Sequence, residues 1–209
     1  MPGRPSAAER AAYYTPRVPP AAPLYPLSLK LSGREAVVVG AGTVAERKVR
    51  ELLAAGALVK VVAPLATPAL RRLAELGALV WHTRPFAGRP DIEGSWLAVA
   101  ATRDPAVQRA VFDAAEACRV FVVAVDDPQN GSAQTPALVR RDPYVIAISS
   151  GGEAPALTRL LREILEQLLP EEGWVDAARA LRVRWRADGT PMGSRFPELV
   201  RLFRARAEK

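Results

Sequence analysis

The sequence contains few of the residues that cross-link chains or hold metals. Its 209 residues include one cysteine, Cys118, and one histidine, His82. A single cysteine excludes an internal disulfide and a cysteine-based metal cluster, and it is typical of the cytoplasm. We expect Cys118 to pack in a helix, His82 to be structural, and the chain to have no resident metal site.

Long apolar runs are also absent. No stretch reaches the roughly 18–20 apolar residues that cross a bilayer, and the first 24 residues, which include six prolines, lack the apolar core of a signal peptide. The net charge of +7 suits an acidic partner, but no basic stripe is interleaved with aromatic residues as in nucleic-acid-binding proteins. We therefore expect residues 1–24 to be a mobile tail, and the protein to be cytoplasmic and to bind neither membrane nor nucleic acid.

Residues 25–137 alternate between short apolar runs and helical patterns. The runs are rich in β-branched residues, as in strands that are buried on both faces of a parallel sheet. Expected strands cover residues 36–39, 58–62, 79–81, 96–101 and 120–125, and expected helices cover 44–55, 67–76 and 105–118. This alternation predicts an α/β fold, a Rossmann-type domain with a parallel sheet.

The remaining residues predict a smaller α+β part and a helical end. One more strand is expected at 144–148, followed by a helix at 155–169 that carries a broad stripe of leucine and isoleucine. Such a stripe must be buried, against either the parent domain or a partner subunit. The last segment is expected to be helical, and the apolar residues on one of its faces are Phe196, Leu199, Val200 and Phe203.

A glycine-rich turn lies between the first expected strand and the first expected helix. Its residues are Gly40, Ala41, Gly42, Thr43, Val44 and Ala45. They match the G-x-G-x-x-G/A pattern in the strand–turn–helix setting in which that pattern binds dinucleotides. The first glycine permits the tight turn, Gly42 lets the backbone approach a pyrophosphate, and Ala45 allows the helix to pack closely. We expect NAD to bind here; the alternative is an ordinary turn that binds nothing.

The carboxylate that commonly binds the ribose is missing from its usual place. In dinucleotide-binding folds an Asp or Glu follows the second strand, about 20 residues after the glycines. Here that strand ends in Val62, Ala63 and Pro64. No arginine for a 2′-phosphate stands there either, so this strand does not decide between NAD and NADP, and NAD is the expected cofactor.

Two further segments carry candidate site residues. Asp126 follows the fifth expected strand, at the carboxyl edge where open α/β sheets bind their ligands, and it is either a general base or a turn-forming aspartate. Ser149, Ser150, Gly151 and Gly152 precede the helix at 155–169. They form either an anion-binding segment or an N-cap and turn.

An ordered set of short motifs goes beyond a generic Rossmann pattern. The motifs lie at residues 25–29, 44–48, 62–64, 100–102, 125–128, 148–152, 154–157 and 159–162. Together they resemble the precorrin-2 dehydrogenase and sirohydrochlorin ferrochelatase family, which includes the N-terminal module of siroheme synthase. The resemblance covers roughly the middle 145 residues.

The resemblance implies an oxidoreductase that converts precorrin-2, a tetrapyrrole, to sirohydrochlorin with NAD. It implies a homodimer with a Rossmann domain at 25–137, a dimerisation domain at 138–170 and a C-terminal helical domain at 171–209. Asp126 matches the catalytic aspartate of the family. The resemblance also assigns cofactor contacts to Ala63, Pro64 and Thr102, and substrate contacts to the segment 149–152.

Several residues near the expected substrate cleft depart from the family pattern. They are Gln108, Val123, Ala133 and Gln134. These departures leave open whether the protein also inserts Fe²⁺ as a ferrochelatase, as some members do, and whether its pathway ends in sirohaem, cobalamin or haem. The alternative function on the same fold is an NAD(H)-binding regulator without chemistry.

Overall fold

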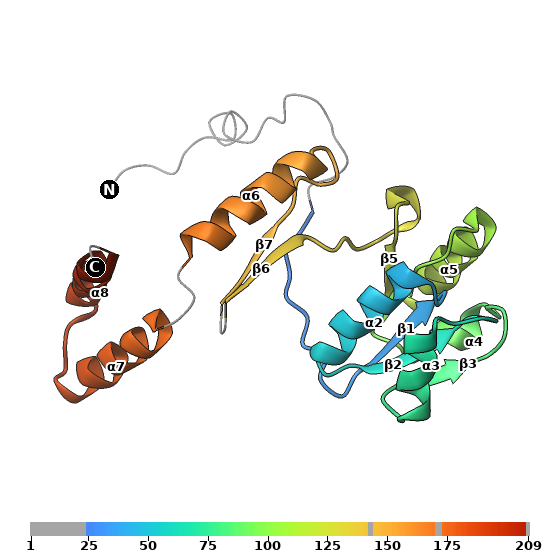
Figure 1. Cartoon of the computed structure of the whole chain (residues 1–209), viewed down its shortest axis with the longest axis horizontal. Helices are drawn as coiled ribbons and strands as arrows, with labels where there is room; N and C mark the ends of the chain where they lie inside the picture. The colour runs from blue at the N-terminus through green and yellow to red at the C-terminus, as the bar shows by residue number, and fades with distance from the viewer. Residues whose placement is uncertain (1–23, 142–143, 170–172, 208–209) are drawn as a thin grey trace, which may run out of the picture. The chain divides into compact units, whose positions relative to one another are not determined.

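A computed structural model describes residues 24–141, 144–169 and 173–207. These residues fall into two compact units, which divide between Thr135 and Pro136 (Figure 1). The mobile tail that the sequence predicts lies, apart from Leu24, outside the described residues.

The first unit contains a five-stranded sheet in which all neighbouring strands are parallel. Its strands are β1 (Glu35–Val39), β2 (Leu58–Val62), β3 (Val80–His82), β4 (Leu97–Ala100) and β5 (Phe121–Ala124). Their order is β3-β2-β1-β4-β5, so the chain moves outward in one direction from β1 and then returns to continue in the other. The expectation of a Rossmann-type parallel sheet is confirmed.

Helices cover both faces of this sheet (Figure 1). They are α2 (Thr43–Ala54), α3 (Pro68–Glu75), α4 (Arg89–Ile92) and α5 (Pro105–Cys118), and a short 3₁₀ helix, η1 (Pro128–Asn130), follows β5. Side chains alternate along each strand, so Val38 packs with residues of α2 and α3, whereas Val37 and Val39 pack with residues of α4 and α5. Because both faces are covered, most residues of the strands are apolar, as the sequence pattern indicated. Cys118, at the end of α5, is half-buried and packs against the cluster that contains Val37 and Val39.

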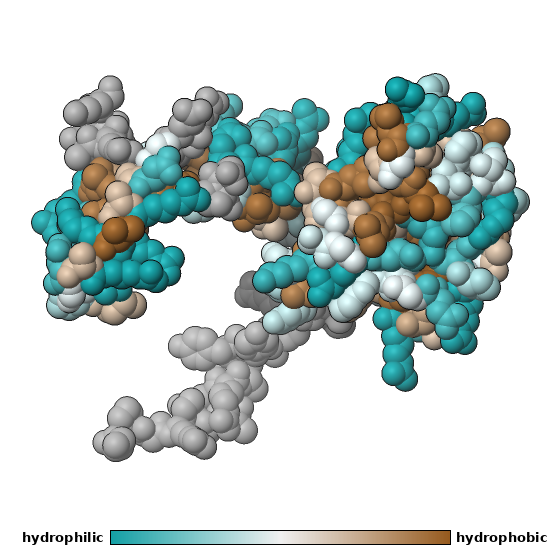
Figure 2. Space-filling model, turned by 90° about the horizontal axis from the view of Figure 1, so that it is seen from below, coloured by the Kyte–Doolittle hydropathy of each residue, from teal (hydrophilic) through white to brown (hydrophobic). Residues whose placement is uncertain are grey.

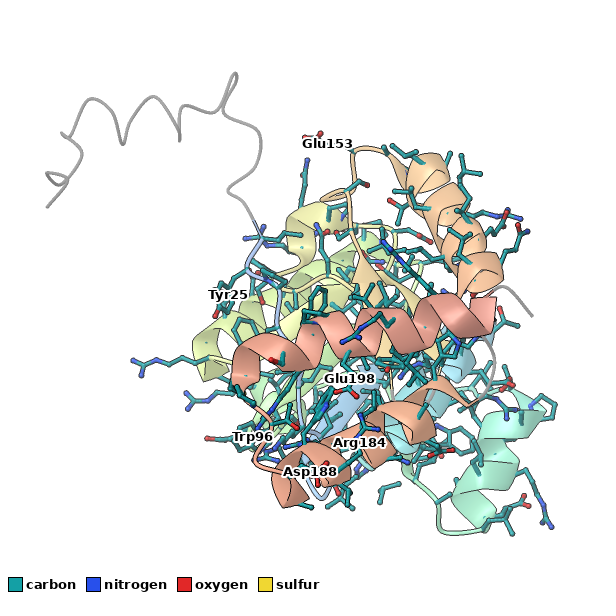
Figure 3. All side chains as sticks on the ribbon, turned by 90° about the vertical axis from the view of Figure 1, so that its left-hand side faces the viewer. Tyr25, Trp96, Glu153, Arg184, Asp188 and Glu198 are labelled. Carbon is teal, nitrogen blue, oxygen red and sulfur yellow. The ribbon has the colours of Figure 1, made fainter. Side chains whose placement is uncertain are left out.

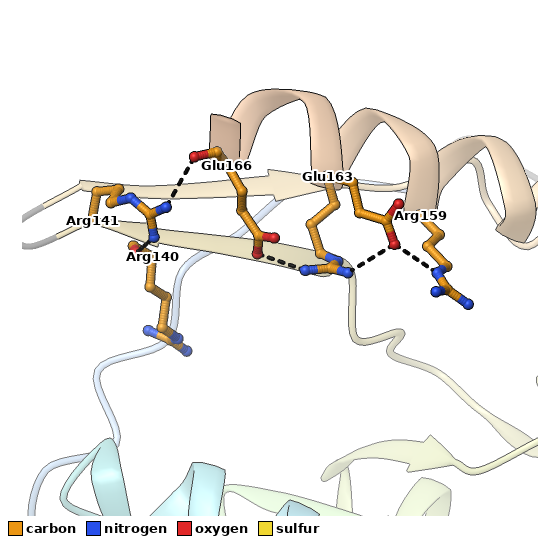
Figure 4. A network of polar contacts seen from close by, with 6 residues as sticks. Arg140, Arg141, Arg159, Glu163 and Glu166 are labelled. Carbon is orange, nitrogen blue, oxygen red and sulfur yellow. Dashed lines mark hydrogen bonds and ion pairs between the residues drawn. The ribbon is translucent and has the colours of Figure 1, made fainter. Parts of the chain in front are cut away.

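The second unit begins with a two-stranded antiparallel sheet and a helix. Strand β6 (Ala137–Arg141) pairs with β7 (Tyr144–Ile148), and α6 (Pro155–Leu168) contacts both. On α6, salt bridges join Arg159 to Glu163 and Arg162 to Glu166 (Figure 4). The guanidinium of Arg141 donates from Nη2 to the carbonyl oxygen of Glu166 at 2.9 Å, which ties β6 to this helix.

Two further helices pack against each other. They are α7 (Trp174–Ala187) and α8 (Met192–Ala207). Arg184 and Glu198 form an ion pair between them (Figure 3), and the Glu198 carboxylate also accepts a hydrogen bond from Trp185 Nε1 at 2.5 Å. The centroids of the Trp174 and Phe203 rings lie 4.4 Å apart. Phe196, expected on the apolar face of this helix, is 71% exposed.

Apolar side chains also reach the surface of both units (Figure 2). Among residues 24–207 that the structure describes, no helix combines the length and the hydropathy that a membrane crossing requires.

Candidate functional site

The glycine turn connects the central strand β1 to α2 at the carboxyl edge of the sheet. Gly40 has a φ of +102°, which L side chains rarely adopt. A Cβ atom at this position would lie 2.3 Å from the carbonyl oxygen of Ala101, which follows β4. Gly40 is therefore required by the fold itself, because the turn must pass directly beside the end of β4.

Gly42 has a different environment. Its φ of −82° is ordinary, and a Cβ atom built on it meets nothing within 4 Å. Gly42 is the N-cap residue of α2, and no side chain caps the helix. The first N–H groups of a helix have no acceptor within it, so this uncapped end presents donors and a positive dipole to an open space. Ala45 is fully buried and lets α2 pack against β1.

The loop after β2 borders the glycine turn. Its Thr67 amide donates to the carbonyl oxygen of Ala41 at 3.1 Å, which joins the two segments directly. Ala63, at the start of this loop, is buried, and its carbonyl oxygen accepts a hydrogen bond from Trp81 Nε1 at 3.0 Å. Ala63 and Pro64 thus belong to the same edge as the turn, as their positions after a parallel strand require.

A carboxylate does reach this loop, but it comes from α2. Glu46 Oε2 accepts a hydrogen bond from Thr67 Oγ1 at 3.0 Å. Hydrogen bonds from Arg50 and then from Thr67 lower the pKa of Glu46, which is therefore ionised at neutral pH. The sequence pattern places such a carboxylate at the end of the second strand and gives no sign of Glu46, because the contact joins residues that are 21 positions apart.

The ends of β4 and β5 are joined by one buried side chain. Gln108 on α5 is only 7% exposed. Its Nε2 donates to the carbonyl oxygen of Thr102 at 2.6 Å and to that of Val125 at 3.2 Å. Thr102 follows β4 and Val125 follows β5, so a single amide holds the two loops together at the carboxyl edge.

Asp126 immediately follows Val125, one of the two residues that Gln108 joins. Its φ is +59°, which places a non-glycine residue in the left-handed region. Asp126 is exposed, and within the described part of the chain its carboxylate has no hydrogen-bond or ion-pair partner. The neighbouring Asp127 differs, because its Oδ2 accepts a hydrogen bond from Asn130 Nδ2 at 2.6 Å. The turn-forming carboxylate is thus that of Asp127, and the free carboxylate is that of Asp126.

The segment before α6 belongs to the second unit. Ser149 Oγ accepts a hydrogen bond from the Gly151 amide at 3.1 Å. Ser150 Oγ accepts one from the Ala154 amide at 3.0 Å and one from Thr158 Oγ1 at 3.1 Å. Both serine hydroxyls therefore accept hydrogen bonds within the turn and at the start of the helix. Gly151 and Gly152 have positive φ and open space around them.

The predicted residues thus form two groups. The glycine turn, the loops that follow β2 and β4, and Asp126 all lie at the carboxyl edge of one sheet, where β1 and β4 form the topological switch point. The serine–glycine segment belongs to the second unit. Among the residues that the structure describes, no group of three histidine, cysteine or acidic side chains is arranged to hold a metal ion.

Comparison with protein families shows to which family the chain belongs. A family model described as "NAD(P)-binding" matches residues 27–137, and a second, "Sirohaem biosynthesis protein central", matches residues 146–168. The chain belongs to this NAD(P)-binding family of sirohaem-biosynthesis proteins. The resemblance that the short sequence motifs indicated is confirmed.

Members of this family are similar to the chain over most of its length. Siroheme synthase 3 of Aeromonas hydrophila is 45% identical over 172 residues, which cover 81% of this chain and 36% of the relative. The siroheme synthase of Xylella fastidiosa is 46% identical over 151 residues, which cover 72% of this chain and 32% of the relative. The chain therefore spans about a third of the length of these curated relatives.

A solved structure matches the chain over most of the length of both proteins. SirC, a precorrin-2 dehydrogenase, superposes with a TM-score of 0.69 and 26% sequence identity, and the match covers 86% of this chain and 89% of that one. The similarity to this family member therefore extends beyond the Rossmann sheet into the second unit.

Proposed function

We propose that this protein oxidises precorrin-2 to sirohydrochlorin, with NAD as the oxidant, in sirohaem biosynthesis. The observation that carries the proposal is the fold match to a precorrin-2 dehydrogenase over nearly the whole length of both chains. The similarity to siroheme synthases and the sirohaem family model for residues 146–168 support the same reaction.

NAD fits the carboxyl edge of the sheet. The proposed contacts are Gly40, Ala41, Gly42, Thr43, Val44, Ala45, Ala63, Pro64 and Thr102. The uncapped N-terminus of α2 and the open space at Gly42 suit a pyrophosphate. Of the two dinucleotides that fit such a fold, NAD is the proposed cofactor.

The reaction removes a hydride and a proton from the reduced macrocycle. When bound, NAD supplies the acceptor for the hydride. Asp126 is the proposed general base, because its free, exposed carboxylate lies at the same edge as the glycine turn. Gly40 and the loops around it hold the groups that bind the cofactor in place.

The substrate and the assembly extend the proposal to the second unit. Tetrapyrroles of this class carry many carboxylates, and Ser149, Ser150, Gly151 and Gly152 lie before the N-terminus of α6, where an anion is favoured. We assign residues 138–170 to dimerisation and residues 171–209 to a C-terminal helical domain, in a cytoplasmic homodimer. The exposed leucines of α6 support the dimer.

An anaerobic assay with precorrin-2 and NAD tests the reaction. We expect NADH and sirohydrochlorin to form in equal amounts. Binding of NAD without turnover would instead indicate the regulator and would contradict the proposal. A second stage, in which Fe²⁺ is added as a substrate, tests whether the protein also has the ferrochelatase activity of some family members.

A further inference from the structure

Gln108 is one of very few polar side chains in the buried part of the first unit. The described residues include three buried polar or charged side chains, and the other two, Asp91 and Ser95, pair with charged neighbours. Burial of an amide costs free energy unless its hydrogen bonds are made. The side-chain amide of Gln108 donates both of its N–H groups to backbone carbonyls, one in each of two different loops.

These two carbonyls lie just beyond the sheet. The last ladder bonds at this edge include one from the Val125 amide to the Ala100 carbonyl oxygen, at 3.0 Å. The carbonyl oxygens of Thr102 and Val125 lie past that point, and both accept hydrogen bonds from Gln108. Gln108 therefore extends the cross-link between β4 and β5 to the residue that precedes Asp126.

Asp126 is held between two anchors. The Gln108 amide fixes Val125 on one side, and the hydrogen bond from Asn130 fixes Asp127 on the other. Between them, Asp126 adopts a φ of +59°. Aspartate is one of the few non-glycine residues that adopt this left-handed region, and such a conformation persists where its surroundings impose it.

We infer that Gln108 is the positioning residue of the site, which holds the Asp126 carboxylate in its reactive place by clamping Val125 to Thr102. This inference rests on the proposed function, because it assigns Gln108 an effect on the step that Asp126 performs. Gln108 acts through Asp126 and is not itself a catalytic residue. A shift of the carboxylate by about 1 Å is enough to slow a reaction roughly 100-fold.

The test is a double-mutant cycle between Gln108→Leu and Asp126→Asn. We expect Gln108→Leu to lower kcat about 10- to 100-fold, with the KM for NAD little changed. In the Asp126→Asn background the same substitution should lower kcat less than about twofold, because the group that Gln108 positions has already been lost. Equal losses in both backgrounds would mean that Gln108 only supports the fold, and would overturn the inference.

Ser95→Ala is the matched control. Ser95 is equally buried and donates to Glu35 Oε1 at 3.0 Å, but it precedes β4 at the opposite edge of the sheet. We expect this variant to lose stability without loss of kcat. If Gln108→Leu does not fold, Gln108→Met replaces it in the cycle, because methionine keeps the length of the side chain but donates no hydrogen bond.

Amide hydrogen exchange at Val125 and Asn130, which donate to the carbonyl oxygens of Ala100 and Asp127, judges the inference without any turnover. We expect exchange there to be faster in the Gln108 variant than in wild type, and unchanged in Ser95→Ala. Unchanged exchange in the Gln108 variant would overturn the inference even if wild type oxidises precorrin-2. Conversely, faster exchange together with an inactive wild type would support the clamp and reject the proposed function.

Discussion

At the scale of single residues, the two adjacent aspartates after β5 have different environments. The sequence suggests that they point to opposite faces of an extended segment, but Asp126 has a left-handed backbone and so the segment is not extended. The difference lies in their partners. Asp127 is hydrogen-bonded to Asn130, whereas the Asp126 carboxylate is free and exposed.

Asp126→Asn should therefore abolish most of the turnover and leave the fold intact. Asparagine tolerates the left-handed region, but it cannot accept the proton as a carboxylate does. We expect kcat to fall by about 10²–10⁴-fold, while the affinity for NAD by calorimetry stays close to wild type. Asp127→Asn keeps an oxygen acceptor for Asn130 and should be far milder. Equal losses in both variants would reveal a structural turn instead of a base.

The two glycines of the turn should respond in opposite ways. Gly40→Ala forces a Cβ atom against the Ala101 carbonyl at positive φ, and we expect it to destabilise the protein by at least about 2 kcal/mol. Gly42→Asp enters open space at a helix N-cap, so urea unfolding should show unchanged or slightly raised stability. The same carboxylate would repel the pyrophosphate, and NAD affinity should fall at least about tenfold. Unimpaired NAD binding by folded Gly42→Asp would remove the turn from the site.

At the scale of elements, the sequence predicts what depends on neighbours along the chain. The strands β1, β2, β4 and β5 are recognisable because burial on both faces makes most of their residues apolar. Strand β6 is not, because it ends in two arginines and becomes a strand by pairing with β7. The short helix α4 lies where the prolines and glycines of residues 83–95 predict only a loop.

The candidate site shows the same limit. The glycine turn and Asp126 are marked by local patterns, but Gln108 reaches its two carbonyls across 6 and 17 positions. No periodicity in the sequence encodes such a contact. The sequence marks Gln108 only as a residue that departs from the family pattern.

The α4 segment is tied to the preceding loop by a buried carboxylate, which predicts a pH dependence. Asp91 is 2% exposed and forms two hydrogen bonds with Arg84, and it accepts another from the Ala87 amide. The hydrogen bonds from Arg84, foremost, lower its pKa, although burial acts in the opposite direction. A lowered pKa in the folded state means that the stabilisation is complete above the unfolded value of about 3.9 and is lost as the pH falls through the folded value.

Urea unfolding between neutral pH and about pH 3 checks this dependence. We expect the stability of wild type to fall more steeply below about pH 4 than that of Asp91→Asn, which should be less stable at neutral pH but flatter. Asp113→Asn is the matched control, because its pair with Arg109 is exposed and such pairs contribute little. Parallel curves for wild type and Asp91→Asn would show that Asp91 is not responsible.

At the scale of the whole molecule, α6 carries one broad apolar face, and most of that face is exposed. Successive residues of a helix are 100° apart, so residues three or four positions apart lie on the same face. Leu165 and Leu169 are half-buried, and α6 contacts both strands of the β6–β7 sheet. The rest of this face is a stripe whose side chains are between 41% and 70% exposed, and its residues are Leu157, Leu160, Leu161, Ile164 and Leu168. An aligned apolar stripe of this size is unusual on a monomer and marks an interaction surface.

The homodimer proposal therefore predicts which leucines separate the subunits and which unfold them. Replacing both Leu161 and Ile164 by Glu places charges on the exposed stripe, so we expect a folded monomer by circular dichroism and light scattering, where wild type is a dimer at micromolar concentration. Leu165→Glu places one charge at a half-buried position and should instead lower the melting temperature, because an unpaired charge is costly in an apolar contact. A second copy is the natural cover for the exposed stripe, since an isologous interface needs only one self-complementary patch on each subunit. A wild-type protein that scatters as a monomer would leave the stripe to some other partner and would contradict the dimer.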